Sequence, residues 1–209
     1  MRLRHKPNAI PEMRENNKIY FDASVNKGKW KEIFGNDNPI HLEIGAGKGD
    51  FVTQMANLHK DINYIALEMN TNAFVVASRK MLDEDMKNVR GIIGNAENLE
   101  EFFEKGEIDK IYLNFSTPWP KKRHHKRRLS HKRFLDRYKK IISDGADLEL
   151  KTDNEDFFDG SLEYFEDFGM AIEKVDRNLD INKSVVTEYE KKFRQRSMPI
   201  YFVAAKFKN

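Results

Sequence analysis

Short apolar runs alternate with helical segments along most of this chain, and this alternation limits the fold more than any other sequence feature. The apolar runs predict strands at 39–44, 62–67, 89–93, 108–115, 147–150, 171–175 and 199–207. Strands that alternate with helices build a mostly parallel sheet, because each crossover returns the chain in the same direction. We therefore predict an α/β fold with a doubly wound, Rossmann-like sheet of about seven strands and helices on both faces.

Glycines, capping residues and apolar spacing set the limits of the predicted helices. These helices lie at 29–34, from Asp50 to about 59, around 73–81, at 99–103, from an N-cap at Ser130 to Gly145, and from about 157 to Gly169. No linker or repeat interrupts the pattern, so 1–209 is predicted to be a single domain, with 1–38 as an N-terminal arm and short helix. The basic segment 1–7 and the polar segment 176–186 are predicted to be mobile.

The composition excludes several classes of protein and site. The 209 residues include no cysteine, which excludes disulfides, thiolate metal sites and catalytic thiols. The six histidines lack the spacing of metal ligands, so no metal is expected. No window has the length of a transmembrane helix, and the N-terminus lacks the apolar core of a signal peptide. We predict a cytoplasmic protein without a membrane partner, either a monomer or a homodimer.

A glycine-rich turn, Gly45-Ala46-Gly47-Lys48-Gly49, follows the first predicted strand of the alternation. Gly45 and Gly47 would let a ligand approach the backbone closely, although such turns also occur without a ligand. Glu68 ends the next strand, where it can accept hydrogen bonds from ribose hydroxyls; alternatively, it caps a helix or lies in its first turn. Glu43 lies in an otherwise apolar strand and can bind the ammonium group of a methionine-type cofactor. The Gly-x-Gly-x-Gly spacing favours S-adenosylmethionine over a dinucleotide, which makes a nicotinamide oxidoreductase the weaker hypothesis.

A basic segment follows the strand predicted at 108–115. Pro118-Trp119-Pro120 ends that strand, because proline cannot donate to a sheet. Between Asp109 and Asp136 there are nine Lys or Arg residues and no acidic residue, whereas the whole chain has a net charge of only +3. Positive charge concentrated at one strand end indicates a polyanion site, although a solubilising loop is the alternative. We therefore predict a nucleic-acid partner.

The carboxyl ends of parallel strands meet at one edge of a sheet, and ligands of such sheets bind there. The residues expected to gather at this edge are Glu43, Gly45, Glu68, Asn95, Thr117 and Asp153. Two of the polar segments have a simpler explanation as helix caps. Asp153 can be the N-cap of the helix that follows it, and Thr187-x-x-Glu190 can be a capping box.

Six motifs together resemble the bacterial tRNA (guanine-N7)-methyltransferase family. They are Phe34-Gly35-Asn36, Tyr112-Leu113-Asn114-Phe115-Ser116, Pro118-Trp119-Pro120-Lys121, Lys126-Arg127-Arg128-Leu129, Lys151-Thr152-Asp153-Asn154 and Thr187-Glu188-Tyr189-Glu190. The resemblance covers nearly the whole chain. It implies a class I methyltransferase that uses S-adenosylmethionine to methylate N7 of guanosine 46 in the variable loop of tRNA.

The resemblance also implies roles for individual residues. The cofactor site would include Glu43, Glu68, Asn95 and Thr117, beside Gly45 and Gly47 of the glycine turn. The substrate would be contacted by Lys121, Asp153, Thr187, Glu188, Tyr189 and Glu190. The RNA-contacting loop would comprise Arg123, His124, His125, Lys126, Arg127 and Arg128. Thr117 and Asp153 occupy the positions expected to support catalysis.

Two positions depart from the family, which usually has Asp in place of both Asn95 and Thr117. An amide oxygen at Asn95 can still accept a hydrogen bond from an adenine amino group, whereas Thr117 offers no charge. Guanine N7 carries a lone pair and no proton, so methylation needs alignment and a negative field but no general base. Asp153, Glu188 and Glu190 are expected to supply part of that field. The alternative is a catalytically weak or inactive RNA-binding protein of the same fold.

Overall fold

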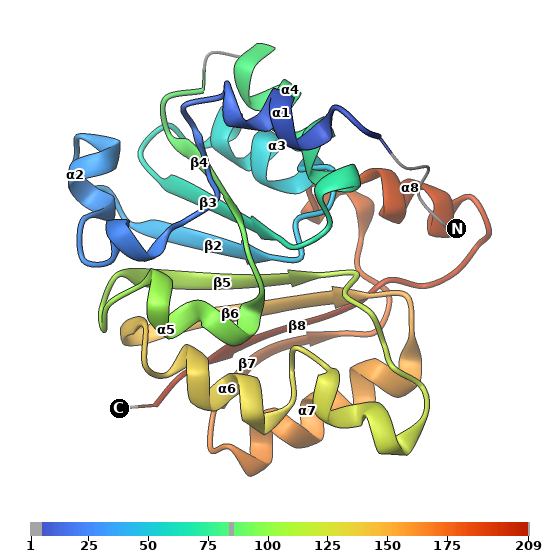
Figure 1. Ribbon diagram of the computed structural model, residues 1–209. Coiled ribbons are helices and arrows are strands. Elements are labelled where there is room, and N and C mark those ends of the chain that lie inside the picture. The colour runs from blue at the N-terminus through green and yellow to red at the C-terminus, as the bar shows by residue number, and fades with distance from the viewer. Residues whose placement is uncertain (1–5, 84–85, 209) are drawn as a thin grey trace.

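The computed structural model describes residues 6–83 and 86–208. Within them, eight strands form one sheet in the order β1-β4-β3-β2-β5-β6-β8-β7 (Figure 1). The strands are β1 (Ile19–Tyr20), β2 (Ile40–Ile44), β3 (Asn63–Glu68), β4 (Val89–Ile93), β5 (Ile108–Asn114), β6 (Ile142–Thr152), β7 (Ala171–Asp176) and β8 (Tyr201–Lys206). All neighbours are parallel except that β8 runs antiparallel to β6 and β7. The predicted, mostly parallel α/β sheet is confirmed, with one strand more than seven.

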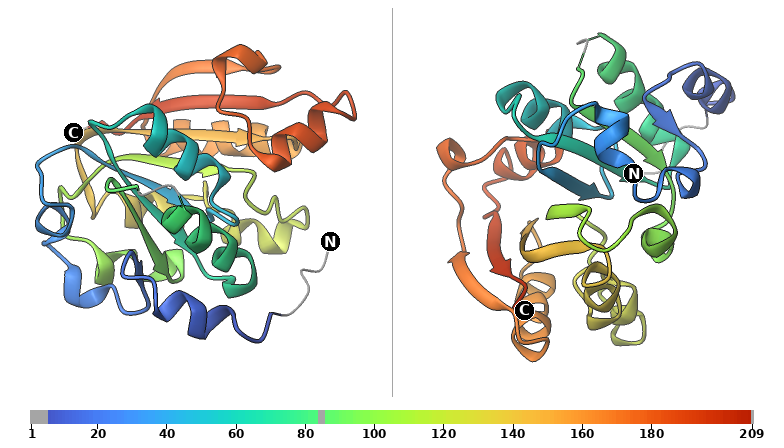
Figure 2. Two further views of the ribbon diagram at one scale, coloured as in Figure 1. Left: turned by 90° about the horizontal axis from the view of Figure 1, so that it is seen from above. Right: turned by 90° about the vertical axis from the view of Figure 1, so that its left-hand side faces the viewer.

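Helices cover both faces of this sheet. The α-helices are α1 (Ala9–Arg14), α2 (Trp30–Phe34), α3 (Asp50–Leu58), α4 (Thr71–Asp83), α5 (Leu99–Phe102), α6 (Lys132–Tyr138), α7 (Glu155–Asp167) and α8 (Glu188–Arg194). Short 3-10 helices are η1 (Ser24–Asn26), η2 (Ala96–Asn98), η3 (Lys122–Arg127) and η4 (Ile181–Lys183). Figure 1 shows α1, α3 and α4 on one side of the sheet and α5, α6 and α7 on the other. The turned views in Figure 2 show β7 and β8 at the edge far from the N-terminal elements.

Apolar side chains pack on both faces of the central strands, which is why those strands read as nearly continuous apolar runs. Leu42 belongs to the cluster under α6 and α7, together with Phe134 and Phe157. Tyr64 belongs to the cluster under α3 and α4, together with Phe74. Burying a charge in such a strand costs free energy. The buried carboxylate of Glu43 in β2 therefore indicates a functional site at the end of that strand.

The N-terminal region is more ordered than the sequence predicts. Residues 19 and 20 form β1 beside β4, although the expectation for 1–38 was an arm and one short helix. Helix α1 packs on α4, and the Asn16 side chain donates to the Ser78 carbonyl and hydroxyl oxygens at 3.0 and 2.9 Å. A two-residue strand is too short to show periodicity, which explains why it was missed. Most of the segment 1–7, predicted to be mobile, lies outside the described residues.

Two predicted boundaries around α6 are wrong. The N-cap is His131, whose ring accepts from the Arg133 amide, while Ser130 is buried with its hydroxyl 2.6 Å from that of Ser161. Gly145 lies inside β6 and does not end the helix. Its φ of +71° suits an irregular strand as well as a helix end, so the glycine alone could not distinguish them.

Candidate active site

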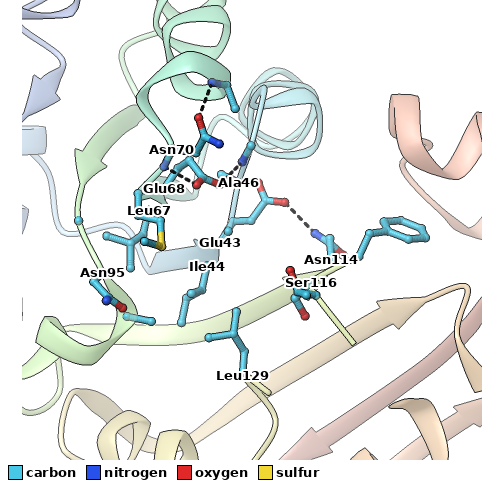
Figure 3. A pocket seen from close by; sticks show the side chains of 18 of the residues that line it. Glu43, Ile44, Ala46, Leu67, Glu68, Asn70, Asn95, Asn114, Ser116 and Leu129 are labelled. Atoms are coloured by element: carbon cyan, nitrogen blue, oxygen red, sulfur yellow. Dashed lines mark hydrogen bonds between the residues drawn. The ribbon is translucent and has the colours of Figure 1, made fainter. Parts of the chain in front are cut away.

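A cavity of about 920 Å³ opens at the carboxyl edge of the sheet, beside the switch point between β2 and β5 (Figure 3). It contains every residue predicted for the cofactor site: Glu43, Gly45, Gly47, Glu68, Asn95 and Thr117. Lys126 and Arg127 of η3 line the same cavity, as do Thr187 and Tyr189 at the start of α8. One cavity therefore joins the glycine turn to the basic segment.

The three glycines of the turn have different tasks. Gly45 and Gly47 have φ values of +81° and +56°, in the left-handed region that favours glycine. A Cβ added at Gly45 would meet no atom within 4 Å, so the space above the turn is open to a ligand. A Cβ at Gly49 would lie 2.7 Å from Ala77 Cβ. Gly45 and Gly47 thus shape the cavity floor, whereas Gly49 lets α3 approach α4.

Glu68 holds the glycine turn in place. Its carboxylate oxygens accept hydrogen bonds from the Gly47 amide at 2.9 Å and the Asn70 amide at 2.7 Å (Figure 3). The helix that follows is capped by Asn70, whose side chain accepts from the amides of Asn72 and Ala73. The alternative of Glu68 as a helix cap is therefore wrong. Each carboxylate oxygen has a second lone pair, which leaves Glu68 able to accept from a ribose diol.

Glu43 is a buried carboxylate with one oxygen committed and one free. Its side chain is only 4% exposed, and Oε1 accepts from Asn114 Nδ2 at 3.0 Å. Among the described residues, Oε2 has no hydrogen-bond partner. Burial raises the pKa of Glu43 to about 7, although the Asn114 hydrogen bond and the charge of Lys151 oppose that rise. An orphaned carboxylate oxygen at a cavity wall fits the ammonium group of S-adenosylmethionine.

The end of β5 supplies two residues that sequence reasoning did not single out as site residues, Asn114 and Ser116. Asn114 positions Glu43, and the buried hydroxyl of Ser116 has no partner within the described part of the chain. A polar residue that ends an apolar run was the available signal for Asn114. Asn95, which was predicted, accepts from the Glu97 amide at 3.0 Å and lines the same wall.

Thr117 lies in a strained turn at the cavity mouth. Phe115 and Trp119, on either side of it, have φ values of +50° and +43°, which are uncommon for bulky residues. The Arg127 guanidinium lies 5.0 Å from the centre of the Trp119 ring, and His124 meets that ring edge-on. These contacts tie η3 to the turn, and Thr117 itself is exposed.

The basic segment divides into exposed and buried residues. Lys121, Arg123, Lys126 and Arg127 are exposed, and His124 and His125 are partly exposed. Arg128 is only 2% exposed, and its Nε donates to the Pro118 carbonyl at 2.8 Å. Its guanidinium also packs over the Phe157 ring. Arg128 therefore holds the loop in place, and its predicted RNA contact stays a prediction.

The predicted substrate segment 187–190 also divides. The Thr187 hydroxyl accepts from the Glu190 amide at 3.1 Å, as a capping residue does. Glu190 is fully buried, 3.2 Å from Lys151 Nζ and 2.7 Å from Arg194 Nη2. Glu190 is thus committed to an internal ion pair, and its predicted substrate role stays a prediction.

Glu188 lies between two ammonium groups. It is 2.5 Å from Lys192 and 2.6 Å from Lys48, and these hydrogen-bonded charges lower the pKa of Glu188 to about 2. Lys48 belongs to the glycine turn, so this contact also fastens α8 to the cofactor side of the cavity. Tyr189 lines the cavity and is 51% exposed.

Asp153 does not cap α7, because the next residue, Asn154, does so. The N-cap of α7 is Asn154, whose side chain accepts from the Phe157 amide at 2.8 Å. Asp153 is half-buried, and burial raises its pKa. Asp153 and Lys121 lie outside the cavity wall. Their predicted substrate contacts stay predictions.

No group of three or more His, Asp or Glu side chains is placed to hold a metal ion in 6–83 or 86–208. Over the same residues, no helix combines the length and apolar character needed to cross a bilayer.

Comparison with known proteins identifies the family of the chain. Residues 37–203 match a family model described as putative methyltransferase. The chain is 45% identical to a tRNA (guanine-N(7)-)-methyltransferase of Listeria monocytogenes, over 99% of both chains. It is 43% identical to the protein of the same name in Bacillus cytotoxicus, over 100% of this chain and 98% of that one. A crystal structure of a SAM-dependent methyltransferase from Aquifex aeolicus has a similar fold, with a TM-score of 0.58 and 15% identity over 96% of this chain and 93% of that one.

Proposed function

Because the chain belongs to the tRNA (guanine-N7)-methyltransferase family, we propose that it methylates N7 of guanine 46 in the variable loop of tRNA. Its cofactor is S-adenosylmethionine, as in the class I methyltransferases. The observation that carries the proposal is the single cavity that joins the free oxygen of Glu43 to the basic residues of η3. We also propose a cytoplasmic location, because the proposed substrate is tRNA.

Three side chains would hold the cofactor. The free Oε2 of Glu43 would accept from its ammonium group, Glu68 from its ribose hydroxyls and Asn95 Oδ1 from its adenine amino group. When bound, the cofactor supplies an electrophilic methyl group. Only the ionised form of Glu43 can neutralise an ammonium group, so cofactor binding is expected to favour release of the proton that burial retains.

The remaining residues align the guanine and stabilise its charge. Guanine N7 would form a bond to the methyl carbon while the bond from that carbon to the sulfonium sulfur breaks. The sulfur leaves as a neutral thioether and the base becomes cationic, without removal of a proton from guanine. Alignment of reactants can supply roughly 7–11 kcal/mol of the barrier. Asp153 is the carboxylate left for the field, because Glu190 is buried in an ion pair and Glu188 is neutralised by Lys48 and Lys192.

Mass spectrometry of tRNA tests the proposal. Unmodified tRNA incubated with the protein and S-adenosylmethionine should gain one methyl group at guanine 46, located by nuclease mapping. A transcript with adenine at position 46 is the matched control and should gain none. Methylation elsewhere, or equal methylation of both transcripts, would contradict the assigned position.

Thr117 favours a second candidate, a catalytically weak or inactive RNA-binding protein of the same fold. Its hydroxyl lies exposed at the cavity wall where the family usually has a carboxylate. A single-turnover assay with saturating protein and cofactor separates the two functions. Methyl transfer above the background of a cofactor-free reaction supports the enzyme, whereas tRNA binding without transfer supports the second candidate.

A further inference from the structure

We propose that Tyr189 and Lys192 of α8, together with Arg196 in the turn that follows it, form a second RNA-binding surface. It would hold the tRNA strand on the side of the cavity opposite η3. The inference rests on the proposed function, since it requires a tRNA base in the cavity. Neither Lys192 nor Arg196 belongs to any of the motifs on which the family resemblance rests.

The two surfaces lie on opposite sides of one opening. Lys126 and Arg127 line the cavity from η3, while Thr187 and Tyr189 line it from the start of α8. Figure 1 shows α8 on one side of the carboxyl ends of β5 and β6, with the yellow-green 122–127 segment on the other. A strand that enters the cavity between them would meet η3 on one flank and α8 on the other.

Helical geometry places Tyr189 and Lys192 on one face of α8, because they are three residues apart within the helix. Lys192 Nζ lies 5.7 Å from the centre of the Tyr189 ring, which shows that the two side chains are adjacent. Arg196 follows the C-cap of α8, in a turn whose amide donates to the Phe193 carbonyl at 2.9 Å.

One side of α8 packs on the rest of the fold. Glu190 and Arg194 are paired inside the protein, and Phe193 stacks on Phe115 with ring centres 5.8 Å apart. These contacts fix the orientation of the helix. Tyr189 lies on the remaining side of the helix with the exposed Lys191, Lys192 and Gln195, and it is the member of this side that lines the cavity.

The chemistry of this face suits RNA. Tyr189 is an exposed aromatic ring at the cavity wall, where a nucleobase next to the methylated guanine can stack on it. Arg196 is exposed and makes no ion pair within the described residues. Lys192 shares Glu188 with Lys48, so two ammonium groups face one carboxylate and the rim keeps a net positive charge.

A base that leaves its stack needs its backbone held on both flanks, because one contact alone leaves the nucleotide free to rotate out of line. Phosphate contacts set register without reading sequence. Lys192 and Arg196 on one flank, with Lys126 and Arg127 on the other, would provide this two-sided grip.

The salt dependence of tRNA binding tests the second surface. Arg196→Gln should lower the log–log salt slope by about 0.7–0.9, and Lys192→Gln with Arg196→Gln by about 1.4–1.8. The single Arg196→Gln variant matters because it breaks no ion pair in the described structure. Lys126→Gln with Arg127→Gln should lower the slope independently, and the two effects should add. Lys29→Gln with Lys87→Gln, two exposed lysines away from the cavity wall, is the matched control and should change nothing.

Variants of Tyr189 test the surface through tRNA affinity, without changing its charge. Tyr189→Ala should weaken tRNA binding by about tenfold with the salt slope unchanged, and Tyr189→Phe should restore most of the affinity because it keeps the ring. Unchanged slopes for both α8 charge variants, beside a lowered slope for the η3 variant, would overturn the second surface and leave the proposed function intact. If wild-type protein binds no tRNA, the proposed function itself fails, a result distinct from either.

Discussion

The two walls of the cavity use charge in opposite ways. On the wall formed by β2, β3 and β4, the functional groups are carboxylates and glycine backbone. On the opposite wall, formed by the end of β5, η3 and the start of α8, they include the exposed cations Lys126 and Arg127. Arg128 and Lys151 are buried behind this wall and hold it together, with the partly exposed Arg194 beside them. Burial, more than residue type, therefore decides whether a charge can serve a ligand or serves the fold.

Loss of the buried carboxylate of the second wall should have the largest effect. Glu190→Gln would remove the carboxylate that pairs with both Lys151 and Arg194, so we expect the free energy of unfolding to fall by about 3–5 kcal/mol. Glu188→Gln is the matched control, because its ion pairs are partly exposed and should contribute about 1 kcal/mol or less. Urea unfolding of both variants measures the difference. Equal losses would mean that burial does not separate the two carboxylates.

This contrast also explains what the sequence could predict. The wall formed by β2, β3 and β4, here called the cofactor wall, is built from residues that are close in sequence. Glu43 and Glu68 lie at the ends of strands, and the glycines directly follow one of them. Periodicity and glycine spacing therefore locate them without knowledge of the tertiary structure. The opposite wall, here called the RNA wall because it carries the proposed RNA contacts, depends on residues that are far apart in sequence. Lys151 pairs with Glu190, and Lys48 pairs with Glu188, which is 140 residues away. The sequence also gives no signal that distinguishes exposed Arg127 from buried Arg128, which are adjacent and alike.

Two errors arose where one residue type suits two local structures. Gly145 has the backbone conformation of a helix end but belongs to a strand, and Ser130 precedes a helix that His131 caps. Both predictions followed a correct local rule. At Gly145 the tertiary structure favours the strand, because β6 already begins at Ile142, which pairs with Ile108 of β5.

Glu43 offers the second test, on the cofactor wall. The unfolded chain releases this proton near pH 4.5, whereas the folded protein without cofactor retains it until about pH 7. Wild-type stability relative to Glu43→Gln should therefore fall as pH rises from 4.5 to 7, by about 3 kcal/mol in total. Denaturant unfolding of both proteins across this range measures it. Glu43→Gln should also bind S-adenosylmethionine more weakly, because it has lost the charge that meets the ammonium group.

Glu188 should show the opposite pH dependence. Its pKa is lowered to about 2, so its stabilising contribution is present above pH 4.5 and is lost as the pH falls toward 2. A wild-type stability that moves in the same direction for both carboxylates would contradict the contrast between the walls.

Glu68→Ala should separate cofactor binding from RNA binding. Loss of a charge-assisted hydrogen bond to the ribose should weaken S-adenosylmethionine binding by about 1.5–3 kcal/mol. The affinity for tRNA should stay close to wild type, because Glu68 lies on the wall that carries no basic loop. Isothermal calorimetry gives the first quantity and filter binding the second. An unchanged cofactor affinity would leave Glu68 with only its role of holding Gly47 and Asn70.

Thr117 lies at the mouth of the cavity. Its replacement should give the smallest of these effects. Thr117→Asp would place a carboxylate at the cavity mouth, where a hydroxyl can form hydrogen bonds but cannot stabilise the positive charge that grows on guanine. The single-turnover rate should rise by roughly tenfold, if that carboxylate contributes about 1.4 kcal/mol to the transition state. The wild-type rate should not be zero, because N7 needs no deprotonation and alignment remains.

Two companion variants show whether charge is the cause. Thr117→Asn has nearly the same shape as Thr117→Asp without the charge, so it should leave the rate near that of wild type. Asp153→Ala should lower the rate both in the wild-type protein and when combined with Thr117→Asp, since Asp153 is the carboxylate left to supply the field in either. If Thr117→Asp and Thr117→Asn change the rate equally, the gain comes from the turn between Phe115 and Trp119, whose left-handed residues any substitution there would disturb. If only Thr117→Asp raises the single-turnover rate, the wild-type cavity lacks a negative charge at this position. The cations of the RNA wall then face the reacting base with no carboxylate here to offset them.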